Sequence, residues 1–373
     1  MTPPGGVGTA TIAFVLPSYR HDEPAGMERA TAALAAGLRT RGHDAYIISS
    51  LAARTTGEAV ETLGSLPATF PCDDPTLRRA VIENRLEIAD ELAGILAARR
   101  TDIVVYVDGL WGLGLLAGDV RYRASRVLAV HVLGHAVDLR PALAAAEEVF
   151  VPSRALLAEA RSAGYETASW HVLANPLLTD PDRLELPDAQ ARAELRRSGP
   201  VRLVARLGSE KGVAAFLQTA NPTGRKVQAV LAEAGFEAEP GSQSALRAHV
   251  QAAAARTGAQ ILPALPWTSV PRFLAGAAVT VVPSLRESFG NLAAESLSVG
   301  TPVIAYRVGN LPELIGDAGM CVDPGAGPRA LWAAVQIVTA DPLRYDAACG
   351  AAYCRSRNYR PTTVADAFIE AVW

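Results

Sequence analysis

The chain has 373 residues, enough for two domains of ordinary size, and its hydrophobic share of 50% is typical of a globular protein with a large core. Its formal net charge of −3 gives no support for a nucleic-acid partner. No apolar run approaches the ~18 residues that a membrane span needs, and no secretory signal opens the chain, so we expect a cytoplasmic protein without a transmembrane segment.

The first half of the sequence alternates between short apolar runs and helical patterns. Residues 1–10 are expected to form a flexible tail. A strand at 12–16, a helix from Gly26 to about Arg41 and a strand at 45–48 predict the start of a doubly wound α/β domain. The other elements expected in this half are irregular loops at 51–76, a long helix at about 77–100, and strands at 103–107, 127–130, 149–151 and 170–173.

Polar and aromatic side chains follow two of these strands directly. Asp108 and Trp111 come after one strand, and His131 and His135 come after the next. Ligands bind at the carboxyl ends of the strands in open α/β sheets, so all four are candidate site residues. The alternative for Trp111 is a core aromatic, and for each histidine it is a satisfied structural side chain.

Residues 177–199 hold several prolines and charges and are expected to connect the two halves. Asp180 and Asp182 within them have a D-x-D spacing, but no hydrophobic strand leads into it, so we predict no metal site there. The four cysteines show no metal-ligand spacing and indicate a reducing compartment. The elements expected in the second half are strands at 201–205, 227–231, 260–262, 279–282 and 303–306, a loop at 236–245, and helices at about 244–256, 270–275, 328–339 and 364–372.

The stretch from Val279 to Ala305 carries the strongest functional pattern. A buried strand ends at Pro283, a loop follows, and a helix begins near Asn291 directly after Gly290. The free backbone amides at such a helix start face outward and favour an anion. This unit therefore predicts a phosphate-binding position at the helix start.

Two carboxylates flank that position. Glu287 lies in the loop and Glu295 about one turn inside the helix, and a carboxylate can accept hydrogen bonds from two sugar hydroxyls. We interpret the unit as a nucleotide-sugar site, with a hexose at Glu287, phosphates at the loop amides and a ribose at Glu295. The alternative is a pair of solvated surface glutamates. The donor-binding candidates between the two carboxylates are Ser288, Phe289, Gly290, Asn291 and Leu292.

The segment ESFGNLAAESLSVGTPVIA resembles the donor-binding segment of retaining GT-B glycosyltransferases of family 4 (glycosyl transferases group 1), whose hallmark is E-x7-E after a strand ending in Pro-Ser. Residues 206–212 (RLGSEKG) resemble the family's G-R-L-x-x-E-K-G segment, with Ala205 in place of the first glycine. The turn before the first helix resembles the family's Gly-Gly pair, with Ala25 in the first position and Gly26 left to approach the donor phosphates.

The resemblance implies roles for further residues. Arg206 and Lys211 are expected to reach the diphosphate, where two fixed cations stabilise the charge of the leaving group more in the transition state than in the ground state. They would take the place of the divalent metal that other transferases use. The family's histidine near the anomeric carbon corresponds to His131, with His135 as the alternate.

The fold implied is an α/β GT-B fold, with two Rossmann-like domains whose parallel sheets face an interdomain cleft. We expect an acceptor-side domain at 1–180, a donor domain at 181–359, and a last helix at about 360–373 that crosses back onto the first domain.

The activity implied is transfer of a hexose-type sugar from a nucleotide diphosphate sugar to a hydroxyl acceptor, with retention and with neither a metal nor a cofactor. The acceptor would be a small molecule, a natural-product aglycone or a cell-envelope glycan. The alternatives are a nucleotide-sugar epimerase of similar fold, a non-catalytic sugar-nucleotide binder, for which Ala25 and Ala205 leave room, and a periplasmic-type binding protein.

Overall fold

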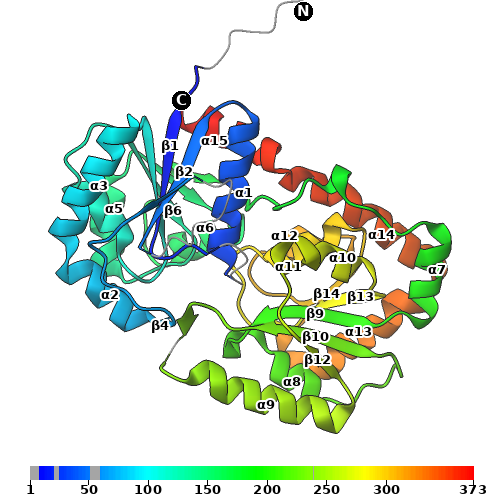
Figure 1. The fold of residues 1–373 in the computed structure, drawn as a ribbon. Coiled ribbons are helices and arrows are strands. Elements are labelled where there is room, and N and C mark those ends of the chain that lie inside the picture. The colour runs from blue at the N-terminus through cyan, green and yellow to red at the C-terminus, as the bar shows by residue number, and fades with distance from the viewer. Residues whose placement is uncertain (1–7, 21–24, 51–58, 238) are drawn as a thin grey trace, which may run out of the picture.

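Two parallel β-sheets, one in each half of the chain, form the centres of two lobes, and helices cover both sheets (Figure 1). The computed structural model describes residues 8–20, 25–50, 59–237 and 239–373.

Among the described residues the first sheet has seven strands in the order β3-β2-β1-β5-β6-β7-β8, all paired in parallel. Every residue of β5 (Ile103–Asp108), the central strand, is buried, because helices pack on both faces of the sheet. Its strands are β1 (Thr11–Leu16), β2 (Asp44–Ser49), β3 (Val60–Thr62), β5 (Ile103–Asp108), β6 (Ser125–Val130), β7 (Glu148–Val151) and β8 (Trp170–Val172). The helices of this half are α1 (Gly26–Thr40), α2 (Asp74–Glu83), α3 (Arg85–Arg99), α4 (Leu116–Asp119), α5 (Ala136–Ala145) and α6 (Arg154–Ser162).

The second sheet has six strands in the described part of the chain, in the order β12-β10-β9-β13-β14-β15, and it is also parallel. Its strands are β9 (Val201–Arg206), β10 (Val227–Ala232), β12 (Gln260–Leu262), β13 (Val279–Val282), β14 (Val303–Tyr306) and β15 (Gly319–Val322). The helices here are α7 (Ala189–Ser198), α8 (Val213–Gln218), α9 (Ser242–Thr257), α10 (Val270–Ala275), α11 (Asn291–Ser298), α12 (Leu311–Ile315), α13 (Pro328–Ala340), α14 (Pro342–Ser356) and α15 (Pro361–Val372).

The strand order reverses between β1 and β5 in the first sheet and between β9 and β13 in the second. In doubly wound folds, ligands bind at this switch point, outside the carboxyl ends of the strands. The two Rossmann-like sheets expected from the sequence are thus confirmed, and each provides a binding edge.

The end of the chain packs on the first lobe. The red α15 lies beside the blue α1 in Figure 1. Val364 and Phe368 of α15 join the core cluster that contains Phe14 of β1. The amide of Leu177 also donates to the carbonyl of Tyr359 at 2.8 Å. The two segments that cross between the lobes are therefore hydrogen-bonded to each other.

Several local expectations were wrong. The helix expected at 77–100 is two helices, α2 and α3, separated at Asn84, whose side-chain amide donates to the Ala80 carbonyl at 2.8 Å and so competes with the helical backbone pattern. The connector at 177–199 contains α7, and the strand β15 and helix α14 were not expected. The expected tail ends earlier, since Ala10 is fully buried and its amide donates to His43 Nδ1 at 3.2 Å.

The loops expected at 51–76 and 236–245 are also partly regular. β4 (Cys72–Asp73) and β11 (Phe236–Glu237) form a two-stranded parallel ladder that joins the two halves of the chain. The remainder of the expected tail, 1–7, and the first part of the expected loop, 51–58, lie outside the described residues.

Candidate functional site

A cleft of about 720 Å³ lies between the carboxyl ends of the two sheets. Both lobes contribute to its lining. Twelve of the fourteen site residues expected from the sequence line it: Gly26, Trp111, His131, Arg206, Lys211, Glu287, Ser288, Phe289, Gly290, Asn291, Leu292 and Glu295. Asp108 and His135 are not part of this lining.

The start of α11 has the geometry that the sequence indicates. Gly290 is its N-cap, with φ of 106°, a region that a residue with a side chain rarely adopts. The buried Phe289 anchors the preceding loop, and its carbonyl accepts a hydrogen bond from Asn310 Nδ2 at 3.2 Å. The backbone amides at this helix start therefore border the cleft with a fixed conformation.

The two loops that follow β9 and β13 meet because these strands are neighbours. The Leu285 amide donates to the Glu210 carbonyl at 2.8 Å. Gly212 has φ of 65° and packs so close to β13 that an added Cβ would lie 2.1 Å from the Pro283 carbonyl oxygen. Glycine at this position allows the loop that carries Lys211 to approach the end of β13.

This contact joins two of the expected catalytic residues. Lys211 Nζ lies 2.6 Å from Glu287 Oε1, and the side chains are 19% and 14% exposed. Ser284 Oγ donates to the same carboxylate oxygen at 2.8 Å, so Glu287 is held by a cation and a hydroxyl. Arg206, which is more exposed, forms its ion pair with Glu210 four residues later.

Glu295 lies deeper, with a side chain 9% exposed, and forms an ion pair with Arg29 of α1. The guanidinium of Arg29 also lies over the Trp267 ring, 5.6 Å from its centroid. The sequence did not indicate Arg29, because nothing near it in the chain suggests a partner in the other lobe.

The start of α1 meets the start of α11 across the cleft. Asn291 Nδ2 donates to the Gly26 carbonyl at 3.0 Å, and Asn291 Oδ1 accepts from Asn175 Nδ2 at 3.0 Å. Ser153 Oγ donates to the Ser288 carbonyl at 2.5 Å. Asn175 and Ser153 were also not expected as site residues, although each follows a strand of the first sheet.

His131 follows β6 and lines the cleft. Burial lowers the pKa of its imidazole to about 4, so the ring is neutral at neutral pH. His135 is exposed and immediately precedes α5. Of the two histidines considered from the sequence, His131 is therefore the one that borders the cleft.

Asp108 is buried and organises the loop after β5, since its carboxylate accepts hydrogen bonds from the amides of Gly109 at 2.8 Å and Gly114 at 3.0 Å. Burial raises the pKa of Asp108 to about 6. Trp111 is 4% exposed, its Nε1 donates to Asp74 Oδ1 at 2.9 Å, and its ring stacks on Phe236 of the other lobe at 4.6 Å. Trp111 thus contributes to the contact between lobes at one end of the cleft.

Within the described ranges, no group of three or more histidine, cysteine or carboxylate side chains is placed to hold a metal ion. Asp180 and Asp182, the pair with D-x-D spacing, both ion-pair with Arg360 where the chain crosses between the lobes. Among the same residues, no helix is both long enough and apolar enough to cross a membrane.

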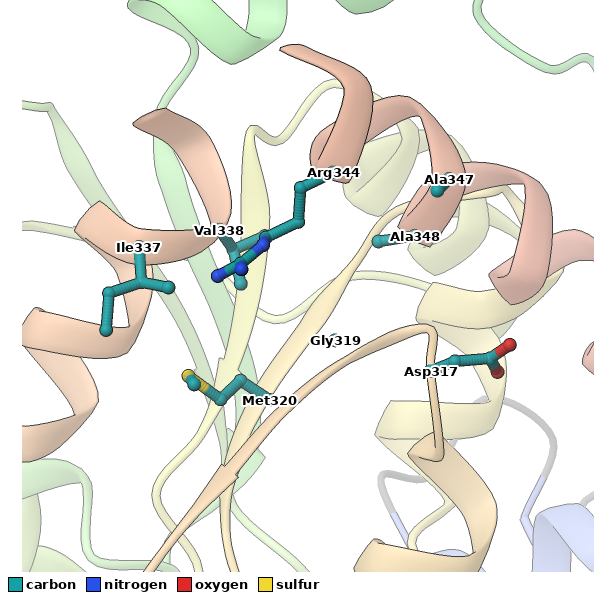
Figure 2. Close-up of a pocket in the computed structure, with 8 residues that line it drawn as sticks. All are labelled: Asp317, Gly319, Met320, Ile337, Val338, Arg344, Ala347 and Ala348. Carbon is teal, nitrogen blue, oxygen red and sulfur yellow. The ribbon is translucent and has the colours of Figure 1, made fainter. Parts of the chain in front are cut away.

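A second hollow, of about 420 Å³, lies on the outer edge of the second sheet between α13, α14 and β15 (Figure 2). Its wall is made largely of aliphatic and small side chains, with Asp317 and Arg344 as its charged members. None of the expected site residues belongs to it, whereas twelve of the fourteen line the interdomain cleft.

Comparison with known proteins relates the second lobe to one family. Residues 201–341 match the family described as glycosyl transferases group 1. The chain is 31% identical over 189 residues to alpha-maltose-1-phosphate synthase of Mycolicibacterium smegmatis, covering 48% of this chain and 47% of that protein. It is 30% identical over 288 residues to D-inositol 3-phosphate glycosyltransferase of Acidothermus cellulolyticus, covering 67% of this chain and 63% of that protein. The matched regions thus span about half to two thirds of the length of these relatives.

Solved structures of the same shape cover nearly the whole chain. Sucrose-phosphate synthase of Thermosynechococcus elongatus superimposes with a TM-score of 0.79 at 19% identity, covering 97% of this chain and 98% of that one. HepE of Anabaena, in complex with UDP and glucose, superimposes with a TM-score of 0.71 at 18% identity, covering 97% and 98%. At these identities the likeness concerns the fold.

Proposed function

We propose, from the premise that this chain is a group 1 glycosyltransferase with the GT-B fold, that it transfers a hexose-type sugar from a nucleotide diphosphate sugar to a hydroxyl acceptor. The observation that carries the proposal is the convergence in one cleft of the α11 start, the Lys211–Glu287 pair and the buried Glu295. Retention of configuration and independence of metal belong to the same proposal.

The donor binds mainly to the second lobe. Its diphosphate lies at the start of α11, where the amides following Gly290 and the helix dipole favour negative charge. Glu295 binds the ribose hydroxyls, and Glu287 orients the hexose. The distance between these glutamates along the loop and helix, eight residues, leaves the diphosphate position between them.

Lys211 and Arg206 stabilise the leaving diphosphate. In this structure Lys211 pairs with Glu287 and Arg206 pairs with Glu210, and phosphate oxygens can replace each carboxylate. As the sugar–phosphate bond breaks, negative charge accumulates on the leaving oxygens. Two cations held at the end of β9 and in the following loop therefore stabilise the transition state more than the ground state. Lysine acts as a point charge and arginine as a two-pronged donor.

The first lobe provides the acceptor side. His131 borders the cleft as a neutral imidazole and is proposed to lie near the anomeric carbon. Met27, Leu110 and Trp111 give this side an apolar lining. We propose a small acceptor here, because the β4–β11 ladder and the Trp111–Phe236 stack join the lobes beside the cleft and limit its size.

The test is a thermal-shift screen of UDP-, GDP-, ADP- and dTDP-sugars, beginning with UDP-glucose because HepE was solved with UDP and glucose. The donor that stabilises the protein is then incubated with acceptors, including D-inositol 3-phosphate, the acceptor named for one relative. Mass spectrometry detects the product and NMR gives its anomeric configuration. Conversion of the donor sugar without any acceptor would instead indicate an epimerase, and binding without turnover would indicate a non-catalytic binder.

A further inference from the structure

The ribose-binding carboxylate proposed above is held by a residue of the opposite lobe. Arg29 extends from the first turn of α1 and forms an ion pair with Glu295 of α11. The two side chains are 15% and 9% exposed, so the contact is largely shielded from water. A shielded pair of this kind resists screening by salt and fixes the orientation of both partners.

The ion pair uses one oxygen of the Glu295 carboxylate and leaves the other oxygen to a different donor. Arg29 contacts Oε1 of Glu295. Oε2 is buried in the lining of the cleft and has no hydrogen-bond partner among the residues that the structure describes. A buried carboxylate oxygen without a donor is costly, and a sugar hydroxyl is a donor of suitable strength. The geometry therefore points to a hydroxyl-bearing ligand at Oε2.

We propose that Arg29 is a positioning residue of the donor site: by holding Oε1 of Glu295 it presents Oε2 to the donor's ribose, so that the ribose site is complete only where the two lobes meet. This inference rests on the proposed function and adds a residue of the first lobe to nucleotide recognition. It makes nucleotide affinity depend on the contact between the lobes.

Other contacts around the Arg29–Glu295 pair also tie the nucleotide site to the contact between the lobes. Trp267, under the Arg29 guanidinium, comes from the second half of the chain yet packs in the core cluster of the first lobe. Asn291, which begins α11, is bonded to the Gly26 carbonyl of α1. The two helices that carry Arg29 and Glu295 are thus also joined at their first residues, and the Arg29 guanidinium is supported by Trp267.

The experiment measures binding by calorimetry for the full chain. The probes are UDP, GDP and ADP, each paired with its 2′,3′-dideoxy counterpart, which lacks both ribose hydroxyls, and dTDP, paired with its 3′-deoxy counterpart, which lacks the one hydroxyl of the deoxyribose. The proteins are the wild type, Arg29→Gln, the conservative Arg29→Lys and a matched control, Arg154→Gln. Arg154 also forms an ion pair between the lobes, with Glu313, but both side chains are more than half exposed and lie outside the cleft lining.

The wild type should bind its nucleotide more tightly than the dideoxy counterpart. Arg29→Gln should weaken nucleotide binding roughly tenfold or more and remove most of that preference, because a hydrogen bond to a buried charged group is lost. Arg29→Lys should retain part of the preference, and Arg154→Gln all of it. If Arg29→Gln is too unstable to measure, Glu295→Gln is compared with the double variant Arg29→Lys/Glu295→Gln. Because Arg29 acts through the Glu295 carboxylate, the double variant should lose no more preference for the ribose hydroxyls than Glu295→Gln alone.

The outcomes separate the two proposals. An Arg29→Gln protein with the wild-type preference for ribose would overturn the role of Arg29 and leave the proposed function standing. Equal binding of the nucleotide and its dideoxy counterpart by the wild type would overturn the ribose role of Glu295. A wild type that binds none of the four nucleotides would refute the proposed function and this inference together.

Discussion

Lys211 Nζ and Glu287 Oε1 lie 2.6 Å apart at the point where the loops after β9 and β13 meet. Both side chains are largely buried, and taking an ion pair out of water costs free energy that the attraction between the charges recovers only in part. A pair in this position can therefore exchange partners, and in the proposed reaction the lysine turns to phosphate and the carboxylate to sugar hydroxyls.

Replacement of Lys211 by alanine should lower kcat by roughly 10²- to 10³-fold, the loss expected when one preorganised charge at the transition state is removed. Lys226→Ala is the matched control, because Lys226 is the other lysine of the chain and is exposed. Steady-state kinetics with the donor found in the screen would measure both. Wild-type turnover in Lys211→Ala would show that this lysine does not stabilise the leaving group.

Gly212→Ala should destabilise the protein more than Gly224→Ala. Both glycines have nearly the same φ, 65° and 66°, but a Cβ at Gly212 would lie 2.1 Å from the Pro283 carbonyl oxygen, whereas a Cβ at Gly224 meets no atom within 4 Å. Gly224→Ala should therefore cost about 1–2 kcal/mol for the left-handed backbone, and Gly212→Ala roughly 3 kcal/mol or more because the two loops must also separate. Denaturant unfolding measures the difference, and equal losses would contradict the close approach.

Treatment with a chelator should leave the transfer rate within about twofold of its starting value, because in the proposed reaction Arg206 and Lys211 supply the charge that a divalent metal provides elsewhere. Asp180→Asn and Asp182→Asn should respond to the chelator in the same way, since these carboxylates are engaged by Arg360. A rate that falls more than tenfold and returns with Mg²⁺ or Mn²⁺ would rule out metal independence.

The parts of the site that could be predicted from the sequence are those whose chemistry is local. Gly290 before α11 and Gly212 after Lys211 occupy backbone conformations that favour glycine. A glycine at each of these positions therefore predicts the shape of the loop from the sequence alone. The strand order, which makes β9 and β13 neighbours and places Lys211 near Glu287, comes from the structure.

The contacts between the lobes could not be predicted in this way. Arg29 and Asn175 are ordinary in their own segments, and their roles depend on α1 and β8 facing α11. The β4–β11 ladder has two residues on each side, too few for an alternating pattern. Trp111 was a candidate site residue with a core aromatic as the alternative, and in the structure its ring stacks on Phe236, a contact that no periodicity reveals.

Asp108 and His131 should make opposite contributions to stability as the pH changes. They lie at the ends of the paired strands β5 and β6, and the His131 amide donates to the Asp108 carbonyl at 3.2 Å. Burial raises the pKa of Asp108 from 3.8 to about 6, so the folded state binds more protons and loses stability as the pH rises from about 4 to 6. Burial lowers the pKa of His131 from 6.5 to about 4, so the unfolded state binds more protons and the folded state gains stability as the pH rises from about 4 to 6.5.

Each contribution amounts to about 3 kcal/mol, so in the wild type they largely cancel. Relative to the wild type, the unfolding free energy of His131→Gln should therefore fall as the pH rises from 4 to 6.5, and that of Asp108→Asn should rise. Urea unfolding at half-unit pH intervals measures both differences, and the direction of each slope is decisive because the substitutions also change packing at every pH. Curves parallel to the wild type would mean that neither group titrates differently in the folded and unfolded states.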